Sequence, residues 1–475
     1  MSGSGESCAA PACISRRVRA ITAVVTTGIY CQPECGARPR AENTRGFPLP
    51  AAAEAAGYRA CLRCRPYRQP QTIDWSAPEL VCRAVRLILD GALDRGNEDE
   101  LARRIGISSR HLRRLFTIHL GVTPDGLARS ARVHFARRLL DDTDLRVTEI
   151  AFAAGFGSLR QFNRACREVF HESPRELRAR RRKADRLVAD GGLPLRLSFT
   201  GELDWGHLLA YFAATAIPGV EQVEGVIYRR TIVVDRRPGV IELRPGGRDY
   251  LVLSAHLPRW DELVHIVQRA RAIAALDLCL DEAKRLLGAD PIIGPLVRAR
   301  PGLRPPGSWD AFECGVRAIV AQHSTTARTN QVMRQLVERF GEPVPGLERL
   351  GLTHTFPTPA SLASADLAQL RLARAPATAL TAFARAVADD EVRLDRSVSL
   401  DQLVASITAL PGVDAATAEY VALRLGEPDA FPAFDRLLLR LSDAARWRPW
   451  RAVAATHLLH DAAAVQVDEQ VRGAA

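Results

Sequence analysis

The sequence predicts a multidomain protein that is mainly α-helical with α+β parts. At 475 residues the chain is longer than one hydrophobic core usually holds, and this length favours about three domains. Two polar stretches rich in proline, glycine or arginine, 66–78 and 179–194, divide it. The residues between them are helix-forming, strand-like runs follow residue 194, and helical patterns resume after residue 257. We therefore expect a small α/β domain, an all-α domain, and a small antiparallel sheet joined to a second all-α domain.

Composition indicates a globular protein with an anionic partner. Hydrophobic residues make up 47% and charged residues 25%, which excludes wholesale disorder. The net charge is +11, and residues 98–183 hold 19 Lys and Arg against 11 Asp and Glu. Such a basic excess favours nucleic acid or a membrane surface. No run of about eighteen apolar residues and no signal-peptide core occurs, so we expect no membrane span and a cytoplasmic, nucleoid-associated location.

Four of the ten cysteines are clustered in the pattern C-x3-C, 25 intervening residues, C-x2-C. They are Cys31, Cys35, Cys61 and Cys64. Two close pairs separated by a loop can place four thiolates at the corners of a tetrahedron around Zn²⁺. The alternative on spacing alone is four unrelated buried cysteines, which is how we interpret Cys82, Cys166, Cys279 and Cys314. The pattern favours zinc.

The basic middle of the chain contains two candidate helix-turn-helix motifs. The first spans 100–116 and carries Arg110 and Arg113 on its solvent face, after a cap at Ser108. The second spans 147–170, with a Gly155–Ser158 turn and four exposed polar residues: Arg160, Gln161, Asn163 and Arg164. Polar side chains on a capped helix suit a recognition helix in the major groove. The alternative is a helical bundle with a solvated arginine face.

The cysteine region closely resembles the methyl-acceptor domain of the Ada family. The matching stretches are TTGIYCQPEC (26–35) and AGYRACLRC (56–64), within an expected domain of residues 1–70. The resemblance implies that Cys31 accepts a methyl group from a methyl phosphotriester in DNA while all four cysteines bind zinc. It also implies phosphate contacts from Thr27, Arg38 and Arg59.

Residues 84–180 resemble the DNA-binding domain of AraC-type regulators. The second motif carries the match most clearly, in IAFAAGFGSLRQFNRACREVFHESPREL (150–177). For an expected domain of residues 78–182, the resemblance implies a regulator that reads double-stranded promoter DNA through tandem recognition helices, with RNA polymerase as a possible partner.

The C-terminal half resembles AlkA-type DNA glycosylases of the helix-hairpin-helix superfamily. The segment LPGVDAATAEY (410–420) matches the hairpin, and FPAFDRL (431–437) the catalytic segment. For expected domains of residues 193–260 and 261–470, this implies Asp435 as the catalytic aspartate. It further implies DNA contacts from Gln322, His323, Gly412 and Asp414, and a base pocket lined by Ala416, Tyr420 and Trp447.

Together these features predict an alkylation-response protein that transfers a methyl group to Cys31, activates transcription and excises 3-methyladenine-type bases. Two alternatives stay open. In the first, the glycosylase half is impaired, because Asp414, Ala416, Leu459 and His323 depart from the family pattern. In the second, zinc only stabilises an AraC-type regulator and no methyl transfer occurs.

Overall fold

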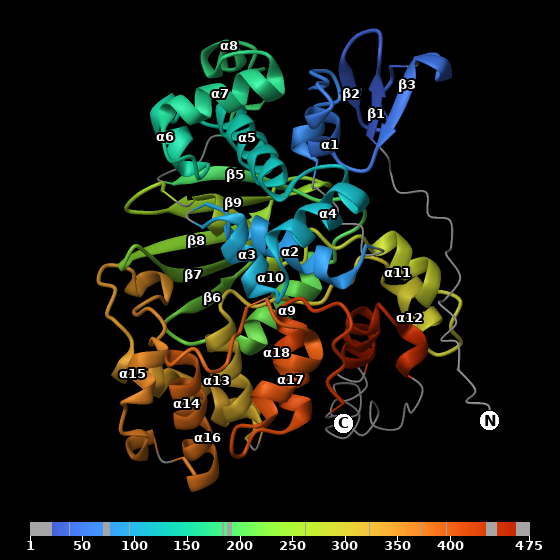
Figure 1. The fold of residues 1–475 in the computed structure, drawn as a ribbon. Helices are drawn as coiled ribbons and strands as arrows, with labels where there is room; N and C mark the ends of the chain where they lie inside the picture. Colours follow the sequence, from blue (N-terminus) through green and yellow to red (C-terminus); the bar gives the residue numbers. More distant parts are fainter. Residues whose placement is uncertain are drawn as a thin grey trace, which may run out of the picture.

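The computed structural model describes residues 21–37, 39–69, 77–94, 96–182, 185–187, 192–261, 263–322, 324–370, 372–395, 397–433 and 444–461. Three parts follow one another in Figure 1. We call them the N-terminal module (21–69), the helical module (77–187) and the C-terminal half (192–461). The multidomain fold predicted from composition and pattern is confirmed.

The N-terminal module is a four-stranded sheet with one short helix against it. The strand order is β3-β1-β2-β4, with β1 antiparallel to β2 and β3, and β2 parallel to β4. Strand β1 alternates buried and half-buried residues, so that Ile21 and Ala23 point into the interior, where Tyr30 of β2 is buried as well. The elements are β1 (Ile21–Val24), β2 (Ile29–Cys31), β3 (Thr44–Phe47), α1 (Pro50–Ala55) and β4 (Arg59–Ala60).

The helical module consists of two helix-turn-helix motifs joined by one long helix. Its helices are α2 (Glu79–Leu89), α3 (Glu98–Arg104), α4 (Ser109–Leu120), α5 (Pro124–Asp142), α6 (Val147–Ala153), α7 (Leu159–Phe170) and α8 (Pro174–Ala179). The caps predicted from the sequence are confirmed, since the Ser108 and Ser158 hydroxyls accept hydrogen bonds from the backbones of His111 and Gln161. Gly106 and Gly155 sit in the two turns at φ values of 78° and 79°, which glycine adopts without strain.

The C-terminal half opens with an antiparallel sheet in the order β5-β9-β8-β7-β6. Its elements are β5 (Leu193–Ser198), α9 (Trp205–Thr215), β6 (Glu221–Glu224), β7 (Ile227–Val234), β8 (Arg237–Pro245), β9 (Tyr250–His256) and α10 (Leu263–Ile273). The sequence Arg237-Pro238-Gly239 predicts a turn at these residues, because proline and glycine favour turns. The structure has no turn there, since Pro238 pairs with Val233 inside the ladder. Asp235 and Arg236, both at positive φ, form the two-residue turn instead.

Helices make up the rest of the C-terminal half. They are α11 (Leu280–Leu287), α12 (Ile293–Ala299), α13 (Ala311–Ala321), α14 (Thr326–Phe340), α15 (Pro359–Ala363), α16 (Arg374–Ala388), α17 (Leu400–Thr408), α18 (Ala415–Arg424) and the helical residues 451–461. Helices α13, α14, α16 and α18 surround a core that contains Phe312, Met333 and Phe383. Among the described helices, none has the length and apolar composition needed to cross a membrane.

The three parts are docked on one another rather than strung on linkers. One continuous hydrophobic cluster includes Tyr30 of the N-terminal module, Phe162 of the helical module and Leu253 of the sheet. Helices α2 and α3 also contact loops of the C-terminal half. There Arg86 pairs with Glu427 at 2.9 Å and Arg104 with Asp395 at 2.7 Å.

A buried ionic cluster at the end of α5 fastens these parts together. Asp141, which is completely buried, pairs with Arg137 at 2.8 Å and with Arg68 of the N-terminal module at 3.2 Å. Its neighbour Asp142 pairs with the same Arg68 at 2.8 Å. The arginines therefore satisfy carboxylates that would otherwise be costly to bury.

We predict that Asp141→Ala lowers the free energy of unfolding by about 3–5 kcal/mol, because it leaves the buried Arg137 guanidinium without its carboxylate partner. Urea unfolding of the full chain, followed by circular dichroism, measures the change. Asp144→Ala is the matched control, since Asp144 is half exposed and its pairs with Arg181 and Arg186 lie at the surface. The control should change stability by less than about 1 kcal/mol. Equal effects of the two substitutions would contradict the role of the cluster.

Candidate zinc centre and DNA-binding surfaces

The four clustered cysteines converge on one point of the N-terminal module. Their sulfur atoms all lie within 4.8 Å of one another. Cys31 ends β2, and the parallel pairing of β2 with β4 brings Cys61 beside it through the bond from Cys61 N–H to the Tyr30 carbonyl, 3.0 Å. Cys31 and Cys61 are buried, whereas Cys35 and Cys64 are half-buried. The spacing is compatible with a tetrahedral zinc site of four cysteine ligands, whose sulfurs lie roughly 3.8 Å apart.

The chemistry of the cluster also fits a cation. In the protein alone, a hydrogen bond to Cys64 raises the pKa of the Cys31 thiol, and the same bond lowers the pKa of Cys64 to about 5. The sulfurs thus share protons, because several adjacent thiolates repel one another. Four thiolates together require a positive charge at their centre. The cluster is a zinc site.

A buried polar triangle connects this centre to α5. The Tyr30 hydroxyl donates to the Glu54 carboxylate at 2.6 Å and lies 3.2 Å from His134 Nε2. The same Glu54 oxygen is 2.6 Å from that ring nitrogen. Burial raises the pKa of Glu54, but the contact with His134 outweighs it and lowers the pKa overall. Sequence reasoning missed this triangle, since its members are up to 104 residues apart.

The predicted recognition helices α4 and α7 present their polar residues to solvent. Arg110, Arg113, Arg160, Gln161 and Arg164 are exposed, and Asn163 is half-buried with its amide bonded to the Leu159 carbonyl. A groove of about 1290 Å³ runs along α7 and is lined by Arg160, Arg164, Arg167 and Arg175. Leu159, at the start of α7, is a partly exposed apolar residue that also lines this groove.

The residues expected to touch DNA phosphates in the N-terminal module are partly accessible. Thr27 is exposed in the turn between β1 and β2, and Arg59 is half-buried on β4. Arg38 lies outside the described residues.

In the C-terminal half, the predicted hairpin is an exposed turn between α17 and α18. Gly412 has a φ of 80°, which is the left-handed conformation that favours glycine. The Asp414 carboxylate caps α18 and accepts a hydrogen bond from Thr417 N–H at 2.7 Å. The Thr417 hydroxyl in turn donates to Gln322 at 3.3 Å, so that Gln322 lies beside the hairpin. His323 and Asp435 fall outside the described residues.

Two of the three predicted base-pocket residues lie on α18, and the third lies elsewhere. Ala416 and Tyr420 are half-buried on α18. Trp447 is 1% exposed in a separate core, where its indole N–H donates to Asp290 at 2.9 Å. The structure thus places Trp447 in a different core from Tyr420, and its role in the base pocket stays a prediction.

The structure adds a second tyrosine that the sequence did not single out. The hydroxyls of Tyr211 and Tyr420 are 2.8 Å apart, and the Arg424 guanidinium lies over both rings, 4.3 and 4.7 Å from their centres. These side chains border a small cavity of about 50 Å³. Nearby, His207 Nδ1 and His460 Nδ1 are 3.1 Å apart, and burial together with His460 lowers the pKa of His207 to about 4. Tyr211 and His207 both come from α9, about two hundred residues before α18, so no local sequence signal marks them.

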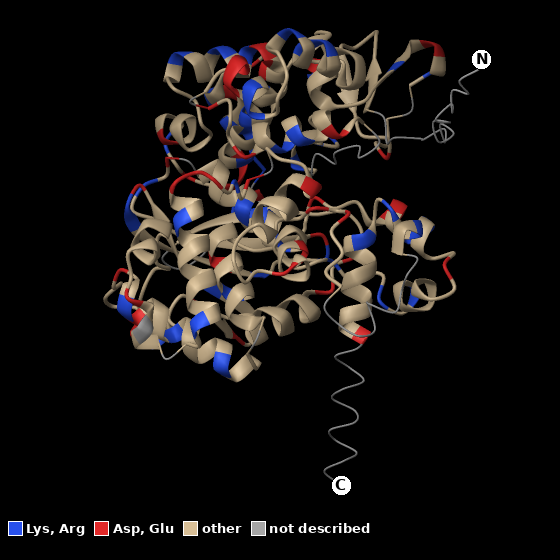
Figure 2. Ribbon diagram, turned by 60° about the horizontal axis from the view of Figure 1, so that its bottom comes forward, with Lys and Arg blue, Asp and Glu red and all other residues tan. Residues whose placement is uncertain are grey.

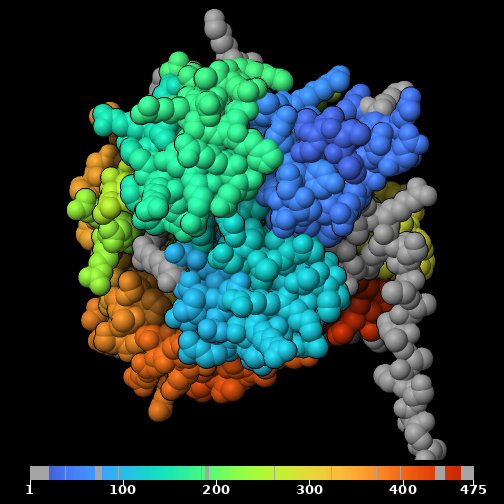
Figure 3. Space-filling view, turned by 45° about the horizontal axis from the view of Figure 1, so that its top comes forward, coloured from blue at the N-terminus to red at the C-terminus, as the bar shows by residue number. Residues whose placement is uncertain are grey.

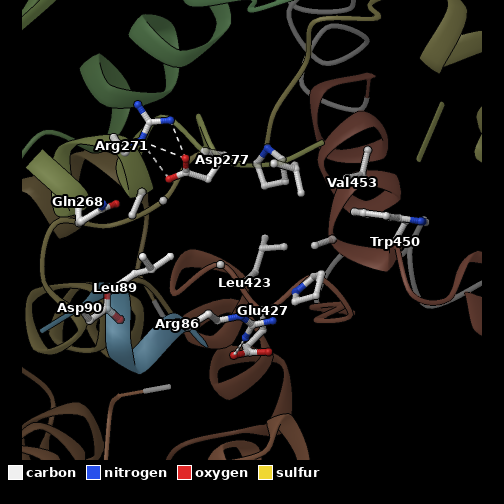
Figure 4. A pocket seen from close by; sticks show the side chains of 18 residues that line it. Arg86, Leu89, Asp90, Gln268, Arg271, Asp277, Leu423, Glu427, Trp450 and Val453 are labelled. Atoms are coloured by element: carbon white, nitrogen blue, oxygen red, sulfur yellow. Dashed lines mark hydrogen bonds and ion pairs between the residues drawn. The ribbon is translucent and has the colours of Figure 1, made fainter. Parts of the chain in front are cut away.

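A further cavity, of about 110 Å³, lies between the helical module and the C-terminal half (Figure 4). The Arg86–Glu427 and Arg271–Asp277 ion pairs border its apolar walls, which include Leu89 and Trp450. Of the predicted site residues that the structure describes, none lines this cavity.

Family models match four successive segments of the chain. They are the metal binding domain of Ada (residues 14–67), a helix-turn-helix domain (101–180), the AlkA N-terminal domain (194–310) and the HhH-GPD superfamily of base excision DNA repair proteins (316–459). Fold and site thus define a DNA-repair protein that joins an Ada-type zinc domain and a helix-turn-helix regulator to a helix-hairpin-helix glycosylase domain. DNA is its partner.

Curated relatives identify the family. The chain is 39% identical over 463 residues to the probable bifunctional transcriptional activator/DNA repair enzyme AlkA of Mycobacterium tuberculosis, covering 92% of each chain. It is also 31% identical to DNA-3-methyladenine glycosylase 2 of Escherichia coli K12, over 55% of this chain and 95% of that one. A third relative is the bifunctional transcriptional activator/DNA repair enzyme Ada of the same organism, at 30% identity over 33% of this chain and 44% of that one. The chain belongs to the family of bifunctional transcriptional activator/DNA repair AlkA proteins.

We predict that Cys64→Ala loses its metal to a chelator that wild type withstands, because three thiolates hold zinc far more weakly than four. Zinc measured by mass spectrometry after gel filtration should fall from one per chain to near zero. Cys82→Ala is the control, since Cys82 is a cysteine of α2 that lies outside the cluster. Retention of zinc by Cys64→Ala would contradict the assignment.

Proposed function

We propose that this chain is a single-turnover DNA methylphosphotriester–cysteine methyltransferase whose methylation activates transcription, and that it is also a glycosylase of the DNA-3-methyladenine type. The observation that carries the proposal is the four-sulfur centre, with Cys31 as its acceptor, in a module docked beside two exposed recognition helices.

The methyl transfer is a direct displacement at carbon. A bond forms between Cys31 Sγ and the methyl carbon while the bond from that carbon to the phosphate oxygen breaks, and the phosphodiester anion leaves. Bound zinc supplies the positive charge that keeps the cysteine thiols deprotonated at neutral pH. Thr27, Arg38 and Arg59 hold the neighbouring phosphates, and no step regenerates the thiolate.

The reaction changes the charge that faces DNA. Four thiolates with one divalent cation carry −2, and methylation of Cys31 reduces this to −1. At roughly 7 Å from a phosphate, one unit of charge is worth about 2 kcal/mol at an effective dielectric near 20. This corresponds to one to two decades of DNA affinity, which suffices for a switch acting on promoter occupancy. Contact with RNA polymerase would then follow from promoter binding.

For the glycosylase, Asp435 is the catalytic residue of the proposal. An alkylated base is cationic and leaves readily once it is flipped out of the stack. The Asp435 carboxylate stabilises the oxocarbenium-like sugar, and water adds to complete the hydrolysis. The adjacent aromatic rings of Tyr420 and Tyr211 support this assignment, because together they can form one wall of a base pocket.

The second candidate function is a methylation-sensing activator whose glycosylase half is impaired. It is favoured by Ala416 and Leu459, which offer no ring for a base to stack on.

We expect Cys31 to gain one methyl group, detected as a mass shift on its peptide, after incubation with duplex DNA that carries a methyl phosphotriester. Affinity for promoter DNA should then rise about ten- to a hundredfold at low salt, and less at high salt because screening weakens the charge effect. Cys31→Ser should show neither change. Unaltered Cys31 in wild type would support a regulator without methyl transfer.

We expect Asp435→Asn to abolish release of free methylated base from alkylated DNA, while wild type releases it. High-performance liquid chromatography of the soluble products measures this release. Asp401→Asn, a substitution at an exposed position of α17, should behave as wild type. Equal, background release by wild type and Asp435→Asn would establish the activator with an impaired glycosylase.

A further inference from the structure

We propose that one copy of this chain binds two DNA duplexes at once, on two separate faces. The recognition face comprises the exposed sides of α4, α7 and the N-terminal module, and the hairpin face comprises residues 411–415 with Gln322. The proposal rests on the DNA binding proposed above for each face. It adds that a duplex bound at one face does not prevent a second duplex from binding at the other.

The recognition face is continuous. Figure 3 shows the N-terminal module, the first helix-turn-helix and the second helix-turn-helix side by side on one side of the molecule. The groove along α7 contributes four arginines to this face. Figure 2 places many further Lys and Arg on the upper helices, interspersed with acidic residues. A duplex carries one negative charge per about 1.7 Å of its axis, so such a face suits its backbone.

The hairpin face lies well apart from α7 and α8, with α4 of the recognition face between them in Figure 1. In Figure 1, α7 and α8 are at the top, α17 and α18 are in the lower half, and the five-stranded sheet lies between them. Pro411, Gly412, Asp414 and Ala415 are exposed there. The backbone N–H groups at the start of a helix suit a phosphate, although Asp414 already occupies the Thr417 N–H.

The two faces cannot swing towards one another, because the parts that carry them are docked. Arg83 donates to the Ser397 carbonyl at 3.3 Å, and the Arg86–Glu427 pair lies one turn further along α2. Arg104 of α3 pairs with Asp395. On the other side, the Asp141 cluster and the shared hydrophobic core hold the N-terminal module and the sheet.

A short duplex is too stiff to follow the surface from one face to the other. The persistence length of DNA is about 150 base pairs, so a duplex of twenty base pairs behaves as a rod. Occupation of both faces therefore requires two duplexes, or two distant segments of a looped one. A chain held at a promoter would then keep its glycosylase face free for a second segment at raised local concentration.

The experiment is a two-duplex capture at fixed salt. A duplex of twenty base pairs with a tetrahydrofuran abasic analogue is fixed to beads, full-length zinc-loaded protein is added, and a fluorescent duplex with a methyl phosphotriester follows. We expect retained fluorescence at least tenfold above that of beads without protein. Gel shifts with each duplex alone establish whether each face binds DNA. If either duplex fails to bind by itself, the proposed function is contradicted. If each duplex binds by itself but the fluorescent duplex is not captured, this inference is contradicted.

Variants separate the faces. Arg160→Glu with Arg164→Glu should abolish capture while the chain still binds the bead duplex. Ala415→Glu, which adds a negative charge at the start of α18 and keeps the backbone, should abolish binding to the beads while the methyl-phosphotriester duplex is still bound. Arg349→Glu makes the same charge change as each recognition-face substitution, at an exposed site outside both faces, and should capture as wild type does.

Mixing the two variants decides whether one chain suffices. An equimolar mixture of the recognition-face and hairpin-face variants should fail to capture, because each molecule keeps only one working face. Capture by the mixture would mean that paired copies bridge the duplexes, and would overturn the proposal. Wild type that binds each duplex alone but releases one when the other is added would overturn it as well.

Discussion

The paired burial of Asp141 and Arg137 is the constraint on which the arrangement of this chain depends. Both side chains are almost completely enclosed, and neither charge could remain buried without the other. Arg68 can join them only if the N-terminal module rests against α5. The same helix also contacts β5, so one helix fixes the positions of the zinc centre and the sheet.

This docking determines how a chemical event at Cys31 can act on DNA binding. Tyr30, the residue before Cys31, is held by Glu54 and His134, and α1 and α5 are each anchored in the common core. A module held at so many buried points is a poor candidate for a large rotation. The change of charge at the zinc centre therefore acts best through the field on the recognition face, which it shares with α4 and α7. On this view the proposed switch is electrostatic and needs no rearrangement of domains.

The sequence predicted those features that local chemistry determines. Cysteine spacing indicated the zinc centre, and the serine caps and turn glycines located α4 and α7. It failed where contacts between distant segments of the chain determine the structure. A proline next to a glycine suggested a turn at Pro238, but the ladder with β7 moved the turn to Asp235 and Arg236. Motif position also gave no sign of Tyr211, which the fold brings to Tyr420 from the far end of the C-terminal half.

The contacts of Asp414 in the hairpin and of Arg424 beside the two tyrosines are compatible with the proposed glycosylase reaction. The Asp414 carboxylate is used as a helix cap, so part of its charge is already satisfied by the Thr417 N–H group. Arg424 lies against Tyr211 and Tyr420, without a carboxylate among its described contacts. In the proposed reaction, positive charge moves from the alkylated base to the sugar as the glycosidic bond breaks. The Arg424 guanidinium behind the two tyrosine rings repels the positive charge of the bound base. This repulsion weakens as the charge moves from the base to the sugar. It therefore favours the transition state over the bound substrate, which is the condition for catalysis.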